Sequence, residues 1–305
     1  MPNDAPIADI RRLTIHDGPG TRDTVFVKGC PLRCLWCHNP ESISRAPQLL
    51  FHERLCIQCG RCKTVCPGGV HKFESGNHLL ERSGCTLCGA CEEVCYTNAL
   101  RLCGKTRKTA EEVFDEVLPD RDFFEQSGGG VTVSGGEPLL YPEFTSRLFE
   151  LLHKEKIATA LDTCGAVGWN AFETVLPFTD LVLFDIKGMD PVMHERNTGM
   201  RNERIHQNLR ELGKRNIPVE IRIPVIPKHN DSEKEIEDAG KFLREIPSVV
   251  RVRLLAYHSM ARDKYRFAGM KDTMPNVPSP SVDALQKDAA LLKKYLSAEI
   301  IVPGK

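Results

Sequence analysis

Cysteine is the residue type whose number and spacing point most directly to chemistry in this chain. The sequence holds 13 cysteines among 305 residues, and 12 of them precede residue 104. Because no basic segment followed by an apolar stretch opens the sequence, we expect a cytoplasmic protein in a reducing compartment. Clustered cysteines in that setting bind metals or act in catalysis more often than they form disulfides. The cysteines therefore predict metal chemistry.

The first group of cysteines is Cys30, Cys34 and Cys37, in the sequence GCPLRCLWCHN. Three thiolates without an evident fourth can hold a cubic [4Fe–4S] cluster and leave one iron open to a substrate. A structural zinc site needs four ligands, and His38 directly follows Cys37, which is poor geometry for a shared metal. The group favours a cluster with one open iron over zinc.

Two further groups of four cysteines repeat the spacing C-x2-C-x2-C-x3-C at an offset of 29 residues. Bacterial ferredoxins use this spacing for [4Fe–4S] clusters, and the fourth cysteine of each run serves the other cluster. Zinc sites prefer two separated cysteine pairs, so the spacing favours clusters. We expect one cluster held by Cys56, Cys59, Cys62 and Cys95, and another held by Cys66, Cys85, Cys88 and Cys91.

The elements that must position these cysteines alternate between strand and helix. Apolar or β-branched runs predict six strands, over 23–29, 130–134, 157–162, 181–186, 217–226 and 250–256. Helices are expected between the strands, among them 110–118, 233–245 and 281–297. The first two of these follow the capping-box pairs Thr109–Glu112 and Ser232–Glu235. Strands separated by helices form right-handed βαβ units, so we expect an α/β fold with a parallel sheet.

The cysteine-rich segment divides the chain into two expected parts. We expect a two-cluster insert over 50–105, between the first two strands, and a main domain formed by 1–49 and 106–305. Lys and Arg together number 41, as do Asp and Glu, and this zero net charge argues against a nucleic-acid partner. No run approaches the 18 or so apolar residues that a membrane span needs.

Polar or glycine-rich residues follow every predicted strand at the carboxyl end, where parallel α/β folds place their sites. In chain order these are Cys30, the segment Ser134–Pro138, the segment Asp162–Gly165, Asp185 with Lys187, Arg222 with Glu220, and His258. Six strand ends with such residues predict one shared site. Cys103 and Cys164 match no cysteine motif, and we expect both to be small buried hydrophobes.

With these features together, the chain resembles the glycyl-radical-enzyme activating enzymes, which are oxidoreductases of the radical S-adenosylmethionine (SAM) superfamily. The signature is HDGPGTRDTVFVKGCPLRCLWCHN at 16–39, and SGGEP, DTCG, DIK and YH at the strand ends also match. The resemblance covers nearly the whole chain, and the insert is like that of the larger family members. It implies a partial (β/α)6 barrel with a ferredoxin-like insert of two [4Fe–4S] clusters.

The resemblance implies the reaction as well. The cluster on Cys30, Cys34 and Cys37 would bind the amino and carboxylate groups of SAM at its open iron. Electron transfer into the sulfonium would yield methionine and a 5′-deoxyadenosyl radical, which removes a hydrogen atom from a backbone glycine of a partner enzyme. Glycine suits this step because it has no side chain to block approach.

The resemblance further implies which residues contact SAM. Gly135 and Gly136 would approach the methionine amino group, with Glu137 orienting their loop. Lys187 would offer its cation to the SAM carboxylate, with the alternative of a structural ion pair to Asp185. The other implied contacts are Trp36 by its backbone or only by packing, His38 as a brace of the cluster loop, Ile186, Asp185 at the ribose, Arg222 in the cavity or paired with Glu220, and His258.

Further partners follow from the same resemblance. Asp162, Thr163 and Asp185 would complete a monovalent-cation site, and the loop Asp17–Arg22 would touch the partner's glycine. The two insert clusters have no open position, so they would carry electrons from ferredoxin or flavodoxin, or else serve only docking. Two other functions stay open: a radical SAM enzyme for a small molecule, and a non-catalytic iron–sulfur carrier, against which the strand-end residues argue.

Overall fold

The computed structural model describes residues 3–303, and its largest element is a nine-stranded sheet in the order β13-β12-β11-β10-β9-β8-β2-β1-β7. Its strands are β1 Asp4–Thr14, β2 Arg22–Val27, β7 Arg107–Thr109, β8 Gly130–Gly135, β9 Ala158–Thr163, β10 Leu181–Asp185, β11 Val219–Val225, β12 Val249–Ala256 and β13 Glu299–Ile301. Neighbouring strands from β2 through β13 pair in parallel, whereas β1 pairs antiparallel with β2 and with β7. The parallel α/β fold expected from the sequence is confirmed.

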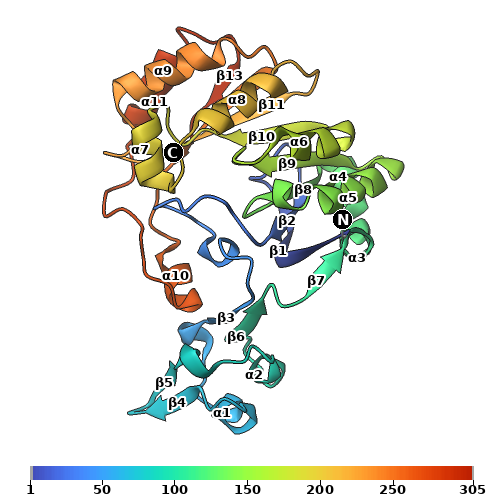
Figure 1. Ribbon diagram of the computed structural model, residues 1–305, viewed down its shortest axis with the longest axis vertical. Helices are drawn as coiled ribbons and strands as arrows, with labels where there is room; N and C mark the ends of the chain where they lie inside the picture. Colours follow the sequence, from blue (N-terminus) through green and yellow to red (C-terminus); the bar gives the residue numbers. More distant parts are fainter. Residues whose placement is uncertain (1–2, 304–305) are drawn as a thin grey trace.

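Helices connect the parallel strands, and most of them cover the outer face of the curved sheet, whereas α10 lies beside the insert (Figure 1). They are α3 Ala110–Val117, α4 Arg121–Ser127, α5 Pro142–Lys154, α6 Trp169–Val175, α7 Pro191–Thr198, α8 Glu203–Leu212, α9 Glu233–Leu243, α10 Arg262–Ala268 and α11 Val282–Leu292. Single turns of 3₁₀ helix are η1 Pro40–Ser42, η2 Glu53–Leu55, η3 Arg82–Gly84, η4 Leu118–Asp120, η5 Pro138–Leu140 and η6 Leu176–Phe178.

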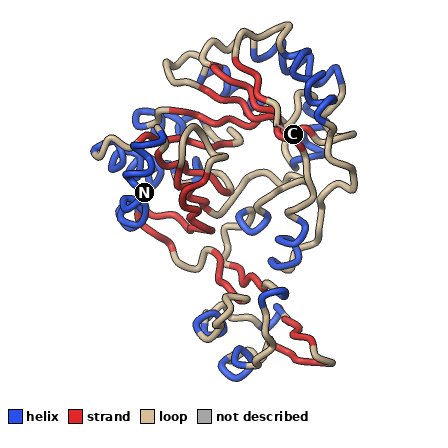
Figure 2. The backbone as a smooth tube through the Cα atoms, turned by 180° about the vertical axis from the view of Figure 1, so that it is seen from behind, coloured by secondary structure: helices blue, strands red, loops and turns tan. Residues whose placement is uncertain are grey.

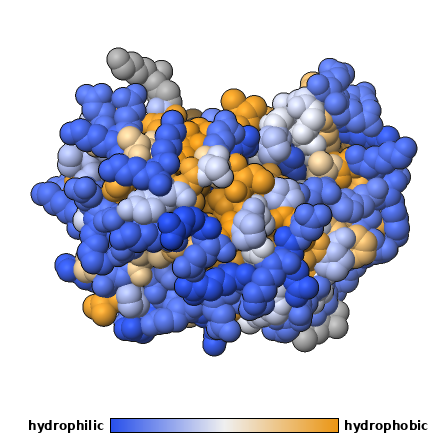
Figure 3. All heavy atoms as spheres, turned by 90° about the horizontal axis from the view of Figure 1, so that it is seen from above, coloured by the Kyte–Doolittle hydropathy of each residue, from blue (hydrophilic) through white to orange (hydrophobic). Residues whose placement is uncertain are grey.

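The apolar faces of these helices and of the strands make one core. On α5, for example, Phe144, Leu148 and Leu152 recur at helical spacing, and all three are fully buried. The polar faces remain outward. Seen from the end opposite the insert, the molecule is mainly hydrophilic, with hydrophobic residues grouped near the middle of that face (Figure 3).

The insert lies below the barrel as a small unit of its own (Figures 1 and 2). Its elements are β3 Gln48–Phe51, α1 Arg61–Val65, β4 His71–Glu74, β5 Asn77–Leu80, α2 Ala90–Glu93 and β6 Leu100–Cys103. β3 pairs with β6, and β4 with β5, both antiparallel. Each short helix follows a glycine in the left-handed conformation, Gly60 before α1 and Gly89 before α2. These glycines are 29 residues apart, as the cysteine repeat predicts.

Both predicted capping-box helices form, but only one has the full box. On α3, the side chain of Thr109 accepts from the N–H of Glu112, and Glu112 accepts from the N–H of Thr109. On α9, Ser232 accepts from the N–H of Glu235. The carboxylate of Glu235 instead accepts from the backbone N–H of Met189 and Asp190, so it joins α9 to the segment after β10.

Candidate active site

The first cysteine group lies on the loop that follows β2, at the carboxyl end of the sheet. The N–H of Cys30 donates to the carbonyl of Ile43 at 3.0 Å. Arg33 and Leu35 donate to carbonyls at the end of α7, at 2.6 and 2.9 Å. Cys30 and Cys34 pack against the main core. The loop is therefore fixed both to the segment that follows η1 and to the end of α7, and these contacts hold the three cysteines in place.

The surroundings of these thiols fit thiolates bound to a cluster. Burial raises the pKa of Cys34 to about 11 and that of Cys37 to about 12. Buried thiols with such pKa values ionise readily only when a metal takes the charge, because iron replaces the proton.

Gly135 and Gly136 pack against the same loop from β8. The N–H of Gly136 donates to Val27 O at 2.9 Å, and the N–H of Glu137 donates to Gly29 O at 2.7 Å. A Cβ on Gly136 would lie 2.0 Å from Gly29 O, and Gly135 has φ +112°. The ends of β8 and β2 therefore approach so closely, directly before Cys30, that only glycine fits at these two positions. This requirement holds whether or not the glycines also contact a ligand.

Glu137 is a fully buried carboxylate that joins the ends of β8 and β9. It accepts from the hydroxyl of Thr163 at 2.8 Å, from the N–H and thiol of Cys164 at 2.9 Å, and from the N–H of Leu139 at 3.0 Å. Burial raises the pKa of Glu137, although these donors oppose the shift. The loop-orienting role predicted for Glu137 agrees with these contacts.

Cys103 and Cys164 are both buried, as predicted, but Cys164 is more than a small hydrophobe. Its thiol donates to the carboxylate of Glu137 at 2.9 Å. The expectation of an apolar role for Cys164 is wrong, because a carboxylate buried beside it makes the thiol a donor.

Lys187 lies next to the cysteine loop just after β10. Its Nζ donates to Asp185 Oδ2 at 2.6 Å, so the ion pair raised as an alternative does form. Burial alone would lower the pKa of Lys187, but Asp185 and Cys34 hold that pKa well above its ordinary value. Ile186, between the two, is 2% exposed and donates its N–H to Arg222 O. The site thus holds a fixed cation beside the thiols.

Arg222 on β11 crosses the inside of the sheet toward the carboxylates of other strand ends. It donates to the carbonyl of His16 at 2.9 Å, and its guanidinium lies 3.4 Å from Asp162 and 3.6 Å from Asp17. Its nearest approach to Glu220 is 3.9 Å, so pairing with Glu220 is the weaker contact. Among the described residues, Arg222 Nε is buried and has no hydrogen-bond partner.

The predicted cation ligands are already engaged with protein groups. Asp162 accepts from the hydroxyl of Ser134 at 2.6 Å and faces Arg222. Burial raises the pKa of Asp162 to about 6, an effect that Arg222 opposes. The hydroxyl of Thr163 donates to Glu137.

Trp36 and His38 lie on the cysteine loop itself, and His258 lies next to His38. Trp36 is 6% exposed in a second apolar cluster, which favours a packing role for its indole. The rings of His38 and His258 are in tilted contact, with centroids 4.3 Å apart, and His38 Nε2 lies 3.2 Å from His258 O. Asn39 accepts from Lys264 at 2.7 Å. His38 and Asn39 therefore join the cysteine loop to the segment after β12.

The loop before β2 departs from expectation at one residue. Asp17 accepts from the hydroxyl of Thr24 at 2.9 Å and faces Arg222 near the site. Arg22, however, is 1% exposed, and its guanidinium donates to Thr132 Oγ1 and to the carbonyl of Val131. Because Arg22 is committed to the sheet interior, it cannot touch a partner protein.

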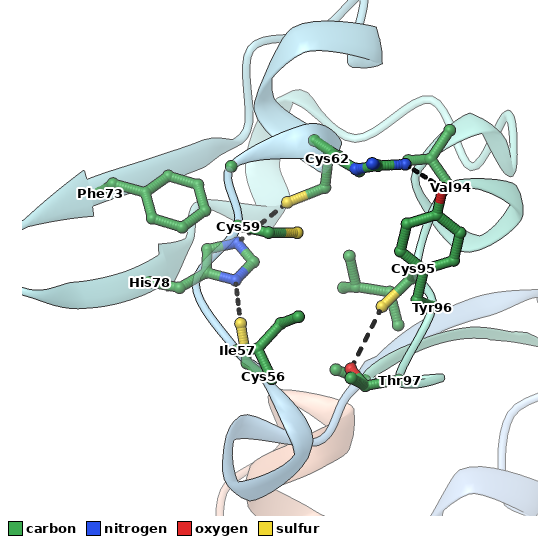
Figure 4. Close-up of a pocket in the computed structure, with 14 residues that line it drawn as sticks. Cys56, Ile57, Cys59, Cys62, Phe73, His78, Val94, Cys95, Tyr96 and Thr97 are labelled. Carbon is green, nitrogen blue, oxygen red and sulfur yellow. Dashed lines mark hydrogen bonds between the residues drawn. The ribbon is translucent and has the colours of Figure 1, made fainter.

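The second and third cysteine groups enclose two separate pockets in the insert. One pocket is lined by Cys56, Cys59, Cys62 and Cys95, and its cysteines point toward a common space (Figure 4). The other is lined by Cys66, Cys85, Cys88 and Cys91. These are the two sets that the exchange of fourth cysteines predicts. Each set has one exposed member, Cys59 or Cys88, and one buried member, Cys62 or Cys91.

Two histidines that no sequence motif indicated also line these pockets. His78 lines the first pocket and His71 lines the second. Both lie on the β4–β5 hairpin between the cysteine runs, outside any recognised spacing. No motif marked them, because only the pairing of β4 with β5 brings the two rings together.

In residues 3–303, no helix is both long enough and apolar enough to cross a membrane.

The chain matches two family models: the radical SAM superfamily over residues 82–240, and a 4Fe-4S dicluster domain over residues 48–96.

Known relatives and structures agree with these matches. The chain is 40% identical to the "(2S)-3-sulfopropanediol dehydratase activating enzyme" of Klebsiella oxytoca, covering 95% of this chain and 93% of the relative. It is 39% identical to the "Isethionate sulfite-lyase activating enzyme" of Nitratidesulfovibrio vulgaris, covering 88% and 89%. A radical SAM methyltransferase from Sphaerobacter thermophilus shares the fold, with TM-score 0.55 and 15% identity over 98% of this chain and 77% of that one.

Proposed function

The chain belongs to the activating enzymes of glycyl radical enzymes, within the radical SAM superfamily, and we propose on this premise how its residues carry out the reaction. A [4Fe–4S] cluster with SAM supplies, when bound, one electron that cleaves the sulfonium, so that the adenosyl carbon can take a hydrogen atom from a backbone glycine of the partner. The observation that carries the assignment of the site is the single loop of Cys30, Cys34 and Cys37 beside the buried cation of Lys187.

The chain's own residues would hold and orient SAM. Lys187 faces the cysteine loop with its charge fixed by Asp185, so it can attract the SAM carboxylate without a large rearrangement. The guanidinium of Arg222 lies among the His16 carbonyl and the carboxylates of Asp162 and Asp17, and we propose that it lines the SAM cavity. We propose Gly135, Gly136 and His258 as further contacts of SAM.

Glu137 acts through other residues. It fixes the ends of β8 and β9 by accepting from Thr163, Cys164 and Leu139. Because Glu137 N–H also donates to Gly29 O, the carboxylate keeps the glycine turn and the cysteine loop in register. Glu137 is therefore a positioning residue.

We propose two additional [4Fe–4S] clusters in the insert, held by the two cysteine sets that line its pockets. Their support is the dicluster family match and the enclosure of four cysteines in each pocket. Neither set leaves an iron open, so both would relay electrons from a ferredoxin or flavodoxin. A monovalent cation at Asp162, Thr163 and Asp185 would have to compete with Arg222 and Lys187 for the two carboxylates.

The partner is a glycyl radical enzyme, but the relatives are named for different partners, so the partner's own reaction is left to experiment. The reduced holoprotein would be mixed with SAM and either (2S)-3-sulfopropanediol dehydratase or isethionate sulfite-lyase. We expect a glycyl radical signal by electron paramagnetic resonance (EPR), matched by 5′-deoxyadenosine. Formation of 5′-deoxyadenosine only with a small molecule, and with no protein, would favour a small-molecule enzyme instead.

A further inference from the structure

The two cluster pockets of the insert are joined by a pair of buried histidines. His71 Nδ1 and His78 Nε2 lie 3.0 Å apart, and the residues are 1% and 8% exposed. His78 lines the pocket of Cys56, Cys59, Cys62 and Cys95, and His71 lines the other pocket. Each pocket therefore has one ring of a hydrogen-bonded pair in its wall.

The ring of His78 is held in place on its faces as well as at its nitrogens. Phe73 stacks on it with centroids 4.5 Å apart and planes within 9°, and Phe51 contacts it with centroids 4.4 Å apart. His78 Nδ1 lies 3.4 Å from Cys56 Sγ, and Nε2 lies 3.8 Å from Cys62 Sγ (Figure 4). The ring is thus fixed with Nδ1 directed at the sulfur of Cys56.

The pair can be protonated in two ways if both rings are neutral, because a neutral imidazole has a single N–H. In the first, His71 Nδ1–H donates to His78 Nε2, and His78 Nδ1–H donates to Cys56. In the second, His78 Nε2–H donates to His71, and the bare Nδ1 of His78 faces the thiolate of Cys56 at 3.4 Å. A lone pair against a thiolate is repulsive, so the geometry selects the first arrangement.

The other end of the pair agrees with this choice. Among the described residues, His71 Nε2 is buried and has no hydrogen-bond partner. No acceptor in the second pocket therefore requires a proton on Nε2. In the first arrangement Nε2 is the nitrogen without a proton, and only the first pocket receives an N–H.

We propose that His78 donates a hydrogen bond to Cys56 and thereby raises the reduction potential of the cluster that Cys56 helps to hold, while His71 fixes the tautomer of His78. Hydrogen bonds to cluster sulfurs are a general means of setting potential, since they stabilise the more negative, reduced state. The two insert clusters then differ in potential although their cysteine spacings are identical. This inference rests on the proposed clusters of the insert.

The same histidines suggest a competing explanation that the experiment must separate. Ligand atoms of Cys62, His71 and His78 lie within 4.8 Å of one another, close enough to hold a metal ion. In our account Cys62 binds a cluster, and both histidines stay outside the iron coordination. A nitrogen bound directly to iron or zinc would contradict that account.

The experiment is an EPR-monitored redox titration of the full-length holoprotein, with iron counted in every sample. A variant with Cys30, Cys34 and Cys37 all changed to Ala identifies the signals of the insert. We expect His78→Leu to make one insert cluster about tenfold harder to reduce, which for one electron is about 59 mV. The potential of the other insert cluster should not move.

Three more variants decide the interpretation. His78→Asn keeps an N–H donor near the position of Nδ1 and should restore most of the potential. His71→Leu frees the tautomer of His78 and should give a smaller shift of the same sign. His52→Leu is the matched control, because His52 packs against Phe267 near the start of the insert and lines neither pocket.

Each outcome has a separate meaning. If the unaltered protein contains no iron in the insert, the proposed clusters themselves are contradicted. Full iron content with equal potentials in the unaltered protein, His78→Leu and His71→Leu would overturn the histidine proposal alone. If His78→Leu loses its cluster, the shift in His71→Leu and the potential of His78→Asn still decide whether the histidine proposal holds. Strong ¹⁴N hyperfine coupling from a coordinated histidine would also overturn it.

Discussion

At the scale of single residues, the site depends on buried groups that hold one another in place. Lys187 keeps its charge in a buried setting because Asp185 is 2.6 Å away, and four donor groups from three residues satisfy the buried carboxylate of Glu137. Such networks tolerate little change, since removing one member leaves a buried polar group without a partner.

The tightest contact in the site is the approach of Gly136 to Gly29, the residue before Cys30. We predict that Gly136→Ala displaces the cysteine loop, because its Cβ would lie 2.0 Å from Gly29 O. The variant should lose about four irons per chain and most of its SAM cleavage, and overpacking of this kind costs about 1–3 kcal/mol.

Gly188→Ala is the control for that experiment. A Cβ at Gly188 would meet only Glu235, at an ordinary 3.7 Å, so iron content and SAM cleavage should stay near those of the unaltered protein. Equal losses in both variants, or normal activity of Gly136→Ala, would show that the glycine contact does not position the loop.

A second prediction concerns pH and Asp23 on β2. Burial and the neighbouring Asp120 raise the pKa of Asp23 to about 7, from 3.8. The folded state therefore holds this proton more tightly than the unfolded state, and the stability that the group contributes falls as pH rises from about 4 to about 7. Asp23→Asn, whose amide does not titrate, should show a smaller drop in melting temperature between pH 5.5 and pH 8.

Thermal unfolding of the anaerobic holoprotein at the two pH values measures this difference. Asp122→Asn is the control, because Asp122 is exposed on α4, and its pH response should match that of the unaltered protein. An Asp23→Asn variant with an unchanged pH response would mean that Asp23 does not hold a proton in the folded state.

At the scale of elements, the strands of the barrel position the site, and α10 contacts the insert. The guanidinium of Arg82, in η3 of the insert, donates to Phe267 O at the end of α10 and also to Leu49 O. Gly269 follows α10, and a Cβ there would lie 2.1 Å from Arg82 Nε. Arg82 therefore fixes how the insert meets the barrel.

We predict that Arg82→Ala loosens this junction without unfolding either part. SAM cleavage driven by reduced flavodoxin should fall several-fold, while iron content and dithionite-driven cleavage change little. Arg54→Ala is the matched control, because Arg54 pairs with Asp263 of the same helix from an exposed position, and such pairs contribute about 0–1 kcal/mol. Equal effects of the two variants on both electron donors would contradict this role of Arg82.

The sequence predicted the elements that are apolar and missed those that are not. The six predicted strands correspond to β2 and β8 through β12, because buried parallel strands are nearly continuous apolar runs. β1 was missed because its exposed polar half, IRRLT, gives no such run, and β13 because it has three residues. The cysteine sets followed from spacing, whereas His71 and His78 depend on strand pairing that spacing does not encode.

At the scale of the whole molecule, one chain combines a SAM-cleaving barrel with an insert that has its own cysteine pockets. The insert contacts the barrel through α10 and through Lys28, a fully buried residue of the barrel that donates to Glu41 O and packs against Gly104 at the end of the insert. Lys28 is two residues before Cys30, so the insert is attached next to the loop of Cys30, Cys34 and Cys37.

The most direct test of this account is SAM cleavage by the anaerobic, dithionite-reduced holoprotein beside its Cys34→Ala variant. The account predicts about twelve irons per chain, four for each of three clusters, and 5′-deoxyadenosine formation that is lost in Cys34→Ala while the insert's irons remain. Iron-loaded protein that forms no 5′-deoxyadenosine, or cleavage that survives Cys34→Ala, would contradict the assignment of Cys30, Cys34 and Cys37 as the reactive centre.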